Sequence, residues 1–269
     1  MNQKPATIQR IAVALDTSPH SRAALLAAVK VAAQLQAQLI GIFVEDLNLL
    51  RLAQLPFAHE VRYASPTPQK LDTGQLEMQL HSQANHAREE LRQIAETHNL
   101  AWSFQVLRGM VAAELLAAAQ DADLLVLGRT GRPAPRNWLG STARTAVHQR
   151  QRPTLLIQPH FHLDQIVLVY DGTAAAQRAL QIAGDLARGN GRLTILLFTP
   201  DRALAQQWQH DIHTQLADTD LAADFHLAQD TAELTAVLTK LDVGLLITSQ
   251  QETVQNLLQV GERPLLIVH

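Results

Sequence analysis

The same series of segments occurs twice along the chain, in the same order. Each copy starts with an apolar run that ends in aspartate, IAVALD at 11–16 and IVLVYD at 166–171. Each copy closes on a related motif, RPTLLI at 152–157 and RPLLIV at 263–268. Between these ends apolar runs alternate with helical stretches, which is typical of a parallel sheet covered by helices. The repeat therefore predicts an α/β chain of two similar units with right-handed crossovers.

The expected architecture is two tandem, doubly wound parallel sheets of five strands each, with the Rossmann-like strand order 3-2-1-4-5. We expect the units at residues 1–158 and 163–269, with a short linker between them. The first copy is longer mainly because of residues 45–74. We expect this segment to form a short helix and an extended stretch, followed by a long helix at about 75–98. Long insertions at strand ends often lie over a site or an interface.

Composition excludes several classes of protein. An apolar share of 47% over 269 residues supports packed cores and argues against a disordered or fibrous chain. The absence of cysteine excludes disulfides, thiolate metal sites and a cysteine nucleophile. No apolar run approaches the roughly 20 residues of a membrane span, and the N-terminus lacks the apolar core of a signal peptide. We therefore expect a cytoplasmic protein that does not enter a membrane.

Charge is distributed unevenly between the two copies. The first 158 residues carry 16 basic and 12 acidic residues, whereas the remaining residues carry 6 and 13. Lysine is scarce and no basic face rich in aromatic residues is visible, so nucleic acid is not an expected partner. Arginines instead gather in one glycine-containing segment of the first copy, where they suggest that a smaller anion binds.

This segment, DLLVLGRTGRPAPRNWLGST at 123–142, is the strongest candidate for a ligand contact. It begins as a buried parallel strand would and leads into a helical pattern. Glycines let the backbone approach a ligand closely, and a helix start offers free N–H groups to an anion. The alternative is an ordinary glycine turn followed by a serine N-cap. We predict a phosphate site formed by Gly128, Arg129, Gly131, Arg132, Gly140, Ser141 and Thr142.

Topology places Asp16 beside the same segment. In an open α/β sheet, ligands bind beyond the carboxyl ends of the strands, where strand order reverses. With order 3-2-1-4-5 this point lies between the first and fourth strands, which end at Asp16 and Gly128. Two interpretations of Asp16 and the adjoining Thr17 remain open. In the first, Asp16 and Thr17 contact a ligand. In the second, Asp16 belongs to a helix start, with Ser18 as cap and Pro19 as first helical residue.

These motifs resemble those of a tandem universal stress protein, and the resemblance covers nearly the whole chain. The family has this fold and an ATP-binding signature, G-x2-G-x9-G-(S/T). GRTG at 128–131 and GST at 140–142 correspond to it, with eight intervening residues instead of nine. The resemblance implies that Asp16 contacts the nucleotide, that backbone near Val44 receives adenine, and that the glycine loop holds ribose and phosphates. It also implies that the two units pair through their last strands as an internal pseudo-dimer.

The second copy provides an internal comparison. Asp171 matches Asp16, but after Ile247 the chain reads TSQQETVQNLLQVGERP. The glycine loop, its arginines and the Gly-Ser pair are all missing from this connection. We therefore predict that the second unit does not bind ATP in the manner of the family.

The expected function is binding of ATP, or of AMP or ADP, in the first unit, with a regulatory or stress-protective role. No Ser/His/Asp triad or paired-carboxylate motif has a supporting context, so any ATP hydrolysis is expected to be slow. Two alternatives stay open. One is a protein-interaction module whose basic loop binds an acidic partner or another anion, and the other is a slow nucleotide hydrolase. A protein partner and a homodimer are compatible with the leading hypothesis.

Metal binding is the weakest of the hypotheses. The twelve histidines show no spacing that indicates a metal site. Glu45 and Asp46 could help to hold Mg²⁺ together with a nucleotide, because they follow the second strand near the predicted crevice. A plain loop role for this pair is the simpler interpretation.

Overall fold

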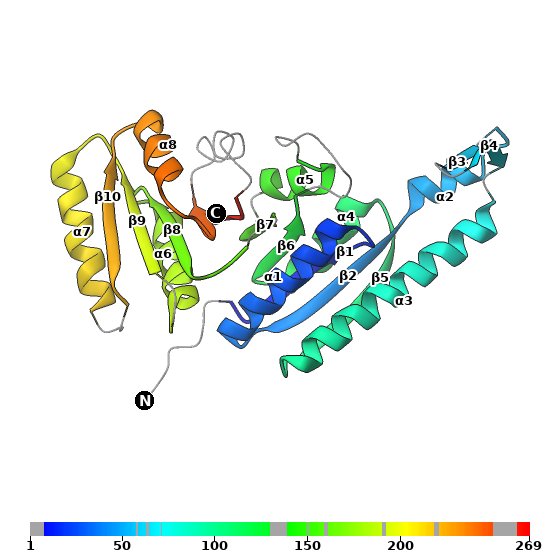
Figure 1. Cartoon of the computed structure of the whole chain (residues 1–269), viewed down its shortest axis with the longest axis horizontal. Coiled ribbons are helices and arrows are strands. Elements are labelled where there is room, and N and C mark those ends of the chain that lie inside the picture. The colour runs from blue at the N-terminus through cyan, green and yellow to red at the C-terminus, as the bar shows by residue number, and fades with distance from the viewer. Residues whose placement is uncertain are drawn as a thin grey trace.

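The computed structural model describes ten stretches of the chain, with the backbone alone at 60–62 and 65–70. The stretches are 8–57, 59–62, 65–70, 72–129, 139–149, 151–158, 161–189, 192–217, 221–249 and 263–269. In Figure 1 the two halves of the chain lie side by side, and helices accompany the strands of each half.

The first half contributes five strands to the main sheet. They are β1 (Arg10–Leu15), β2 (Gln38–Asp46), β5 (Trp102–Gly109), β6 (Leu124–Gly128) and β7 (Thr154–Ile157). Across the sheet they run β5-β2-β1-β6-β7, all parallel, which confirms the predicted order 3-2-1-4-5. The connections hold α1 (Pro19–Leu35), α3 (Thr73–Thr97), α4 (Val111–Ala118) with the short 3-10 helix η1 (Ala119–Asp121), and α5 (Ser141–Gln149).

The second half repeats this arrangement. Its strands are β8 (Gln165–Tyr170), β9 (Arg192–Phe198), β10 (Ala223–Ala228), β11 (Leu245–Thr248) and β12 (Leu265–Ile267). They run β10-β9-β8-β11-β12, again in parallel. The described helices between them are α6 (Ala174–Ala187), α7 (Arg202–Leu216) and α8 (Thr231–Lys240).

The last strands of the two halves join them into one sheet of ten strands. β7 and β12 pair in antiparallel fashion, with Leu156 opposite Leu265. The pairing through last strands that the resemblance implied is therefore present. Helices α1 and α6 are in contact beside this junction, where the side-chain amide of Gln34 donates a hydrogen bond to the backbone carbonyl of Arg188.

The central strands are buried on both faces, which explains their nearly continuous apolar sequences. In β1, Ile11 and Val13 belong to the core on one face and Ala12 to the core on the other. In β6, Leu124 and Leu125 alternate in the same way. Because successive side chains of a strand point to opposite faces, the two cores together hold the sheet between its helices.

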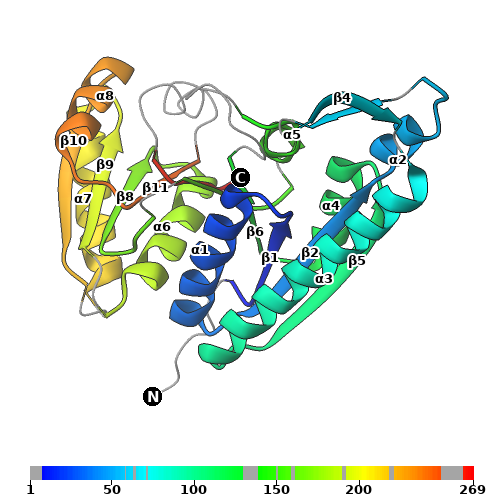
Figure 2. The ribbon, with the colours of Figure 1, turned by 45° about the vertical axis from the view of Figure 1, so that its right-hand side comes forward.

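The excursion after β2 forms a short helix and a hairpin outside the main sheet. The helix is α2 (Leu47–Ala53), and the hairpin pairs β3 (His59–Arg62) with β4 (Ser65–Lys70). The expected helix and extended stretch are thus both present, and the long helix α3 starts at Thr73. α2 packs on the first turns of α3 through the small apolar cluster Leu50, Ala53, Leu76 and Leu80 (Figure 2).

Candidate ligand-binding site

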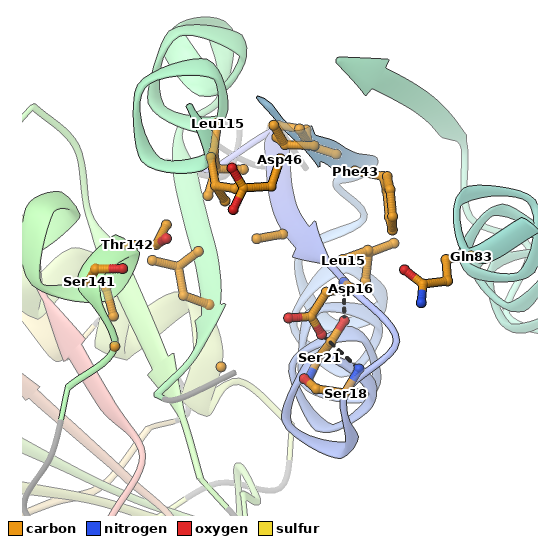
Figure 3. A pocket seen from close by; sticks show the side chains of 18 of the residues that line it. Leu15, Asp16, Ser18, Ser21, Phe43, Asp46, Gln83, Leu115, Ser141 and Thr142 are labelled. Atoms are coloured by element: carbon orange, nitrogen blue, oxygen red, sulfur yellow. Dashed lines mark hydrogen bonds between the residues drawn. The ribbon is translucent and has the colours of Figure 1, made fainter. Parts of the chain in front are cut away.

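A cavity opens in the first half of the chain, where its central strands diverge. β1 pairs with β6 as far as Val13 and Val126, and with β2 as far as Leu15 and Phe43. After that, α1 covers one face of the sheet and α5 covers the other. Because consecutive connections leave toward opposite faces, space remains between them at the carboxyl ends of the strands. A cavity of about 340 Å³ lies at this point (Figure 3).

The structure brings most of the predicted site residues to this cavity. It is lined by Asp16, Val44, Gly128, Arg129, Gly140, Ser141 and Thr142. Thr17 is not among the lining residues. Gly131 and Arg132 lie outside the residues that the structure describes. The two ends of the glycine segment and the end of β1 therefore face one space.

Asp16 is part of a helix start and also part of the cavity wall. Its Oδ1 accepts a hydrogen bond from the Ser18 N–H at 2.8 Å, and its own N–H donates to Ser21 Oγ at 2.9 Å. Ser18 is the N-cap of α1 and accepts from the Ser21 N–H, with Pro19 as first helical residue. The helix-start interpretation is thus confirmed. The ligand interpretation stays a prediction, and the position of Asp16 on the cavity wall is compatible with it.

Gly128 has a packing role of its own. A Cβ at this position would lie 3.0 Å from both the Cβ and the carbonyl oxygen of His20, in the first turn of α1. Contacts this short force a shift, and here the obstacle includes backbone. The close approach of α1 to β6 therefore favours glycine here whether or not a ligand binds.

Gly140 closes the glycine segment and starts a helix. Its N–H donates to the carbonyl of Arg129 at 2.9 Å, so this amide serves the loop. Its carbonyl accepts from the Arg144 N–H, also at 2.9 Å, which is the first hydrogen bond of α5. The N–H groups of Ser141, Thr142 and Ala143 belong to the first turn, where an α-helix offers them no partner of its own. All three residues line the cavity, so this wall favours an anion.

Charged residues line different parts of the cavity. Arg129, which directly follows β6, is only 5% exposed and belongs to the wall together with the start of α5. Asp16 and Asp46 bring carboxylates from the ends of β1 and β2. In Figure 3, Ser141 and Thr142 lie across the cavity from Phe43 and Gln83, with Asp16 between these two groups. The arrangement fits a ligand with a negative group at one end and hydroxyl or amino groups farther along.

Residues 7–158, more than half of the chain, match the model of the universal stress protein family. The chain belongs to this family. A universal stress protein from Archaeoglobus fulgidus DSM 4304 superimposes with a TM-score of 0.70 at 13% identity, covering 96% of this chain and 97% of that one. A functionally unknown protein from Pseudomonas aeruginosa PAO1 gives 0.61 at 14% identity, covering 97% and 92%. At such identities the similarity shows the fold alone. A comparison with curated proteins gave no match.

No helix in the described stretches of this universal stress protein is both long and apolar enough to cross a membrane.

Sequence reasoning missed the side of the cavity contributed by α3. Leu80 and Gln83 line the space from this helix, and Phe43 lines it from β2. The apolar spacing of α3 indicated which of its residues are buried, and Gln83 directly precedes the buried Ala84. Nothing in that spacing showed that the edge of the buried stripe would reach the end of β1, more than sixty residues away along the chain.

Glu45 and Asp46 have separate roles in this universal stress protein. Glu45 is 5% exposed and does not line the cavity; Arg108 Nε and Nη2 each lie 2.8 Å from its Oε2. Hydrogen bonding to Glu45 is the main reason that the pKa of Arg108 is raised above its ordinary value. Asp46 lines the cavity and accepts from the Asn48 N–H at 2.9 Å, as the N-cap of α2. The two carboxylates therefore do not face one metal position together.

An aromatic side chain packs beside the matching helix start in the second half of this universal stress protein. Asp171 Oδ1 accepts from Thr173 N and Oγ1 at 3.1 and 2.7 Å, which reproduces the helix start seen at Asp16. The next residue, Gly172, has a φ of +76°, and any Cβ there would collide with the Trp208 ring. Trp208 also packs edge to face on Tyr170, with ring centroids 5.5 Å apart. Trp208 thus packs against the residues on both sides of Asp171.

Proposed function

We propose that this universal stress protein binds an adenine nucleotide, ATP, ADP or AMP, in the cavity of its first half, and that the bound nucleotide serves a regulatory or stress-protective role. The observation that carries the proposal is the cavity at the crossover between β1 and β6. Arg129 and the first turn of α5 line it, and Asp16 lies between this turn and the wall that contains Phe43 and Gln83. Family membership supports the same class of ligand.

The phosphates would lie at the start of α5. Phosphate oxygens are acceptors, and this wall offers donors. The donors are the first-turn N–H groups, the Ser141 and Thr142 hydroxyls and the Arg129 guanidinium. A hydrogen bond to a charged group contributes about 1.5–3 kcal/mol, so loss of one such donor should weaken binding measurably. Gly131 and Arg132 are proposed to add to this site.

The nucleoside would extend toward the ends of β1 and β2. The Asp16 carboxylate can accept hydrogen bonds from ribose hydroxyls, because one of its oxygens suffices for the contact with Ser18. The backbone at Val44, just beyond the last paired residues of β1 and β2, would meet the base. If ATP carries Mg²⁺, the phosphates would hold the ion, since the described residues include no cluster of three metal-binding side chains.

Titration calorimetry tests the proposal. ATP, ADP and AMP should each be bound with a stoichiometry of one per chain, since we propose one functional cavity. Arg129→Gln should weaken ATP binding by roughly tenfold or more. Arg144→Gln provides the matched control, because Arg144 is exposed on α5 and does not line the cavity. Absence of binding by well-folded protein would exclude the proposal.

Two further measurements separate the alternatives. Product formation from ATP should stay far below about 1 s⁻¹, the low end of ordinary enzyme turnover, and faster turnover would favour a hydrolase. Nucleotide released from freshly purified, heat-denatured protein would identify the natural ligand class directly. A protein that binds acidic peptides but no nucleotide would support the interaction module instead. A protein partner and a homodimer remain predictions that these experiments do not address.

A further inference from the structure

The side of the cavity opposite α5 has the composition of a base-binding site. Leu15 from β1, Phe43 from β2 and Leu80 from α3 line this side, and all three are buried. Figure 3 shows Phe43 and Gln83 together on this side, across the cavity from Ser141. Apolar side chains with a single polar group suit a flat heteroaromatic ring, whose faces are apolar and whose edge is polar.

Gln83 is the polar group on this side of the cavity. Its side chain leaves α3 in the direction of Leu15 and Phe43, and it is exposed apart from this approach (Figure 3). The neighbouring Leu80 and Ala84 are buried, so the helix face on which Gln83 stands is fixed by packing. A carboxamide offers two N–H donors and a carbonyl acceptor at one position.

This pairing of donor and acceptor complements one purine better than the others. Adenine presents an amino donor at N6 beside an acceptor at N7, and glutamine matches this edge with two hydrogen bonds. Guanine and hypoxanthine present two acceptors there, O6 and N7, so one of the two hydrogen bonds is lost. The Gln83 carbonyl would then face an acceptor of the base instead of a donor, and such a mismatch lets a single side chain discriminate between similar ligands.

We propose that Gln83 is a specificity-determining residue that selects adenine over hypoxanthine and guanine in the cavity. The inference rests on the proposed function, because it assigns the base end of the same nucleotide. It adds a contact from α3, whereas the family resemblance points to backbone at Val44.

Binding of ATP and of ITP, measured side by side, tests this role. The two nucleotides have the same phosphates and ribose, so the ratio of their affinities depends on the base alone. The native protein should bind ATP about tenfold more tightly than ITP, and Gln83→Leu should bring the ratio close to one. Gln79→Leu should keep the native ratio, because Gln79 is exposed on the same helix and does not line the cavity.

A second variant tests the direction of the effect. Arginine donates to both O6 and N7, so Gln83→Arg should reverse the preference in favour of ITP. The added charge acts equally on both triphosphates and leaves the ratio a measure of base recognition. If the native protein binds neither nucleotide, the proposed function fails and this inference fails with it. If ATP binds well but Gln83→Leu keeps the native ratio, the nucleotide site stands and the role of Gln83 is refuted.

Discussion

The Cα of Gly128 faces the first turn of α1 so closely that a Cβ there would lie 3.0 Å from the carbonyl oxygen of His20. The end of β6 and the start of α1 form two walls of the cavity, and they meet closely at this point. The glycine that looks from the sequence like a phosphate contact is therefore also a spacer between two elements of the fold.

Gly128→Ala should destabilise the fold. The new methyl group must displace backbone of α1, and overpacking of this kind costs about 1–3 kcal/mol. Urea denaturation of the variant and the native protein measures the difference. Gly184→Ala is the matched control, since a Cβ at Gly184 in α6 meets nothing within 4 Å and alanine is about 1 kcal/mol better than glycine in a helix interior. Equal stability of Gly128→Ala and native protein would contradict the packing role.

Asp16→Asn separates the two roles of this residue. Asparagine keeps an oxygen that accepts from the Ser18 N–H, so the free energy of unfolding should change by less than about 0.5 kcal/mol. Loss of the negative charge should weaken hydrogen bonds to ribose hydroxyls and reduce nucleotide affinity several-fold. Calorimetry and urea denaturation of the same sample give both quantities. Asp171→Asn, at the matching helix start, should alter neither, and unchanged affinity in Asp16→Asn would exclude Asp16 as a ligand contact.

Trp208→Ala should lower stability without creating a second binding site. Removal of the ring eliminates its contacts with Tyr170 and Gly172 and leaves a space behind, at a cost of about 3 kcal/mol. Nucleotide stoichiometry should stay at one per chain, because no arginine-bearing glycine loop follows β11 in the sequence. Two equivalents of ATP bound to the variant would show that Trp208 alone blocks the second half.

Arg108→Leu should lower the free energy of unfolding. It removes the guanidinium that hydrogen-bonds the buried Glu45 carboxylate, although the half-exposed position of Arg108 weakens this pair relative to one that is buried on both sides. Replacement of both residues, Glu45→Leu with Arg108→Leu, should recover much of the loss, and chemical denaturation of all three variants measures the coupling. A double variant no more stable than Arg108→Leu would argue against an ion pair.

The contribution of Arg108 to the free energy of unfolding should not depend on pH in the ordinary range. Its pKa is raised above the ordinary value of arginine, chiefly by hydrogen bonding to Glu45, so the stabilising charge is fully present at neutral and moderately alkaline pH and is lost only in strong alkali. Denaturation of the native protein at pH 7 and pH 9 should show no contribution from this group. A change between these values that disappears in Arg108→Leu would contradict the assignment.

The sequence predicts the fold well because its decisive signals are local. Apolar runs such as 124–127 are long enough to mark buried strands, and their duplication confirms each assignment. Strand order then follows from the alternation of strands and helices, and it places Asp16 and Gly128 at the same crevice.

The parts of the site that escaped prediction depend on packing between distant elements. Whether Gln83 reaches the cavity depends on the rotation of α3 over β1, which its own spacing does not fix. The contact between His20 and Gly128 depends on the height of α1 above the sheet. Both are set by the fit of side chains across the core rather than by any single segment.

The two halves that pair through β7 and β12 belong to one chain, so their association is unimolecular. In a protein assembled from separate subunits, dilution would dissociate this interface, whereas a covalent link holds the partner strand at a high effective concentration. The second half can therefore cover the edge of β7 in every molecule without binding a ligand of its own. A response to nucleotide in the first half would then depend on the amount of nucleotide and not on how much of the protein the cell contains.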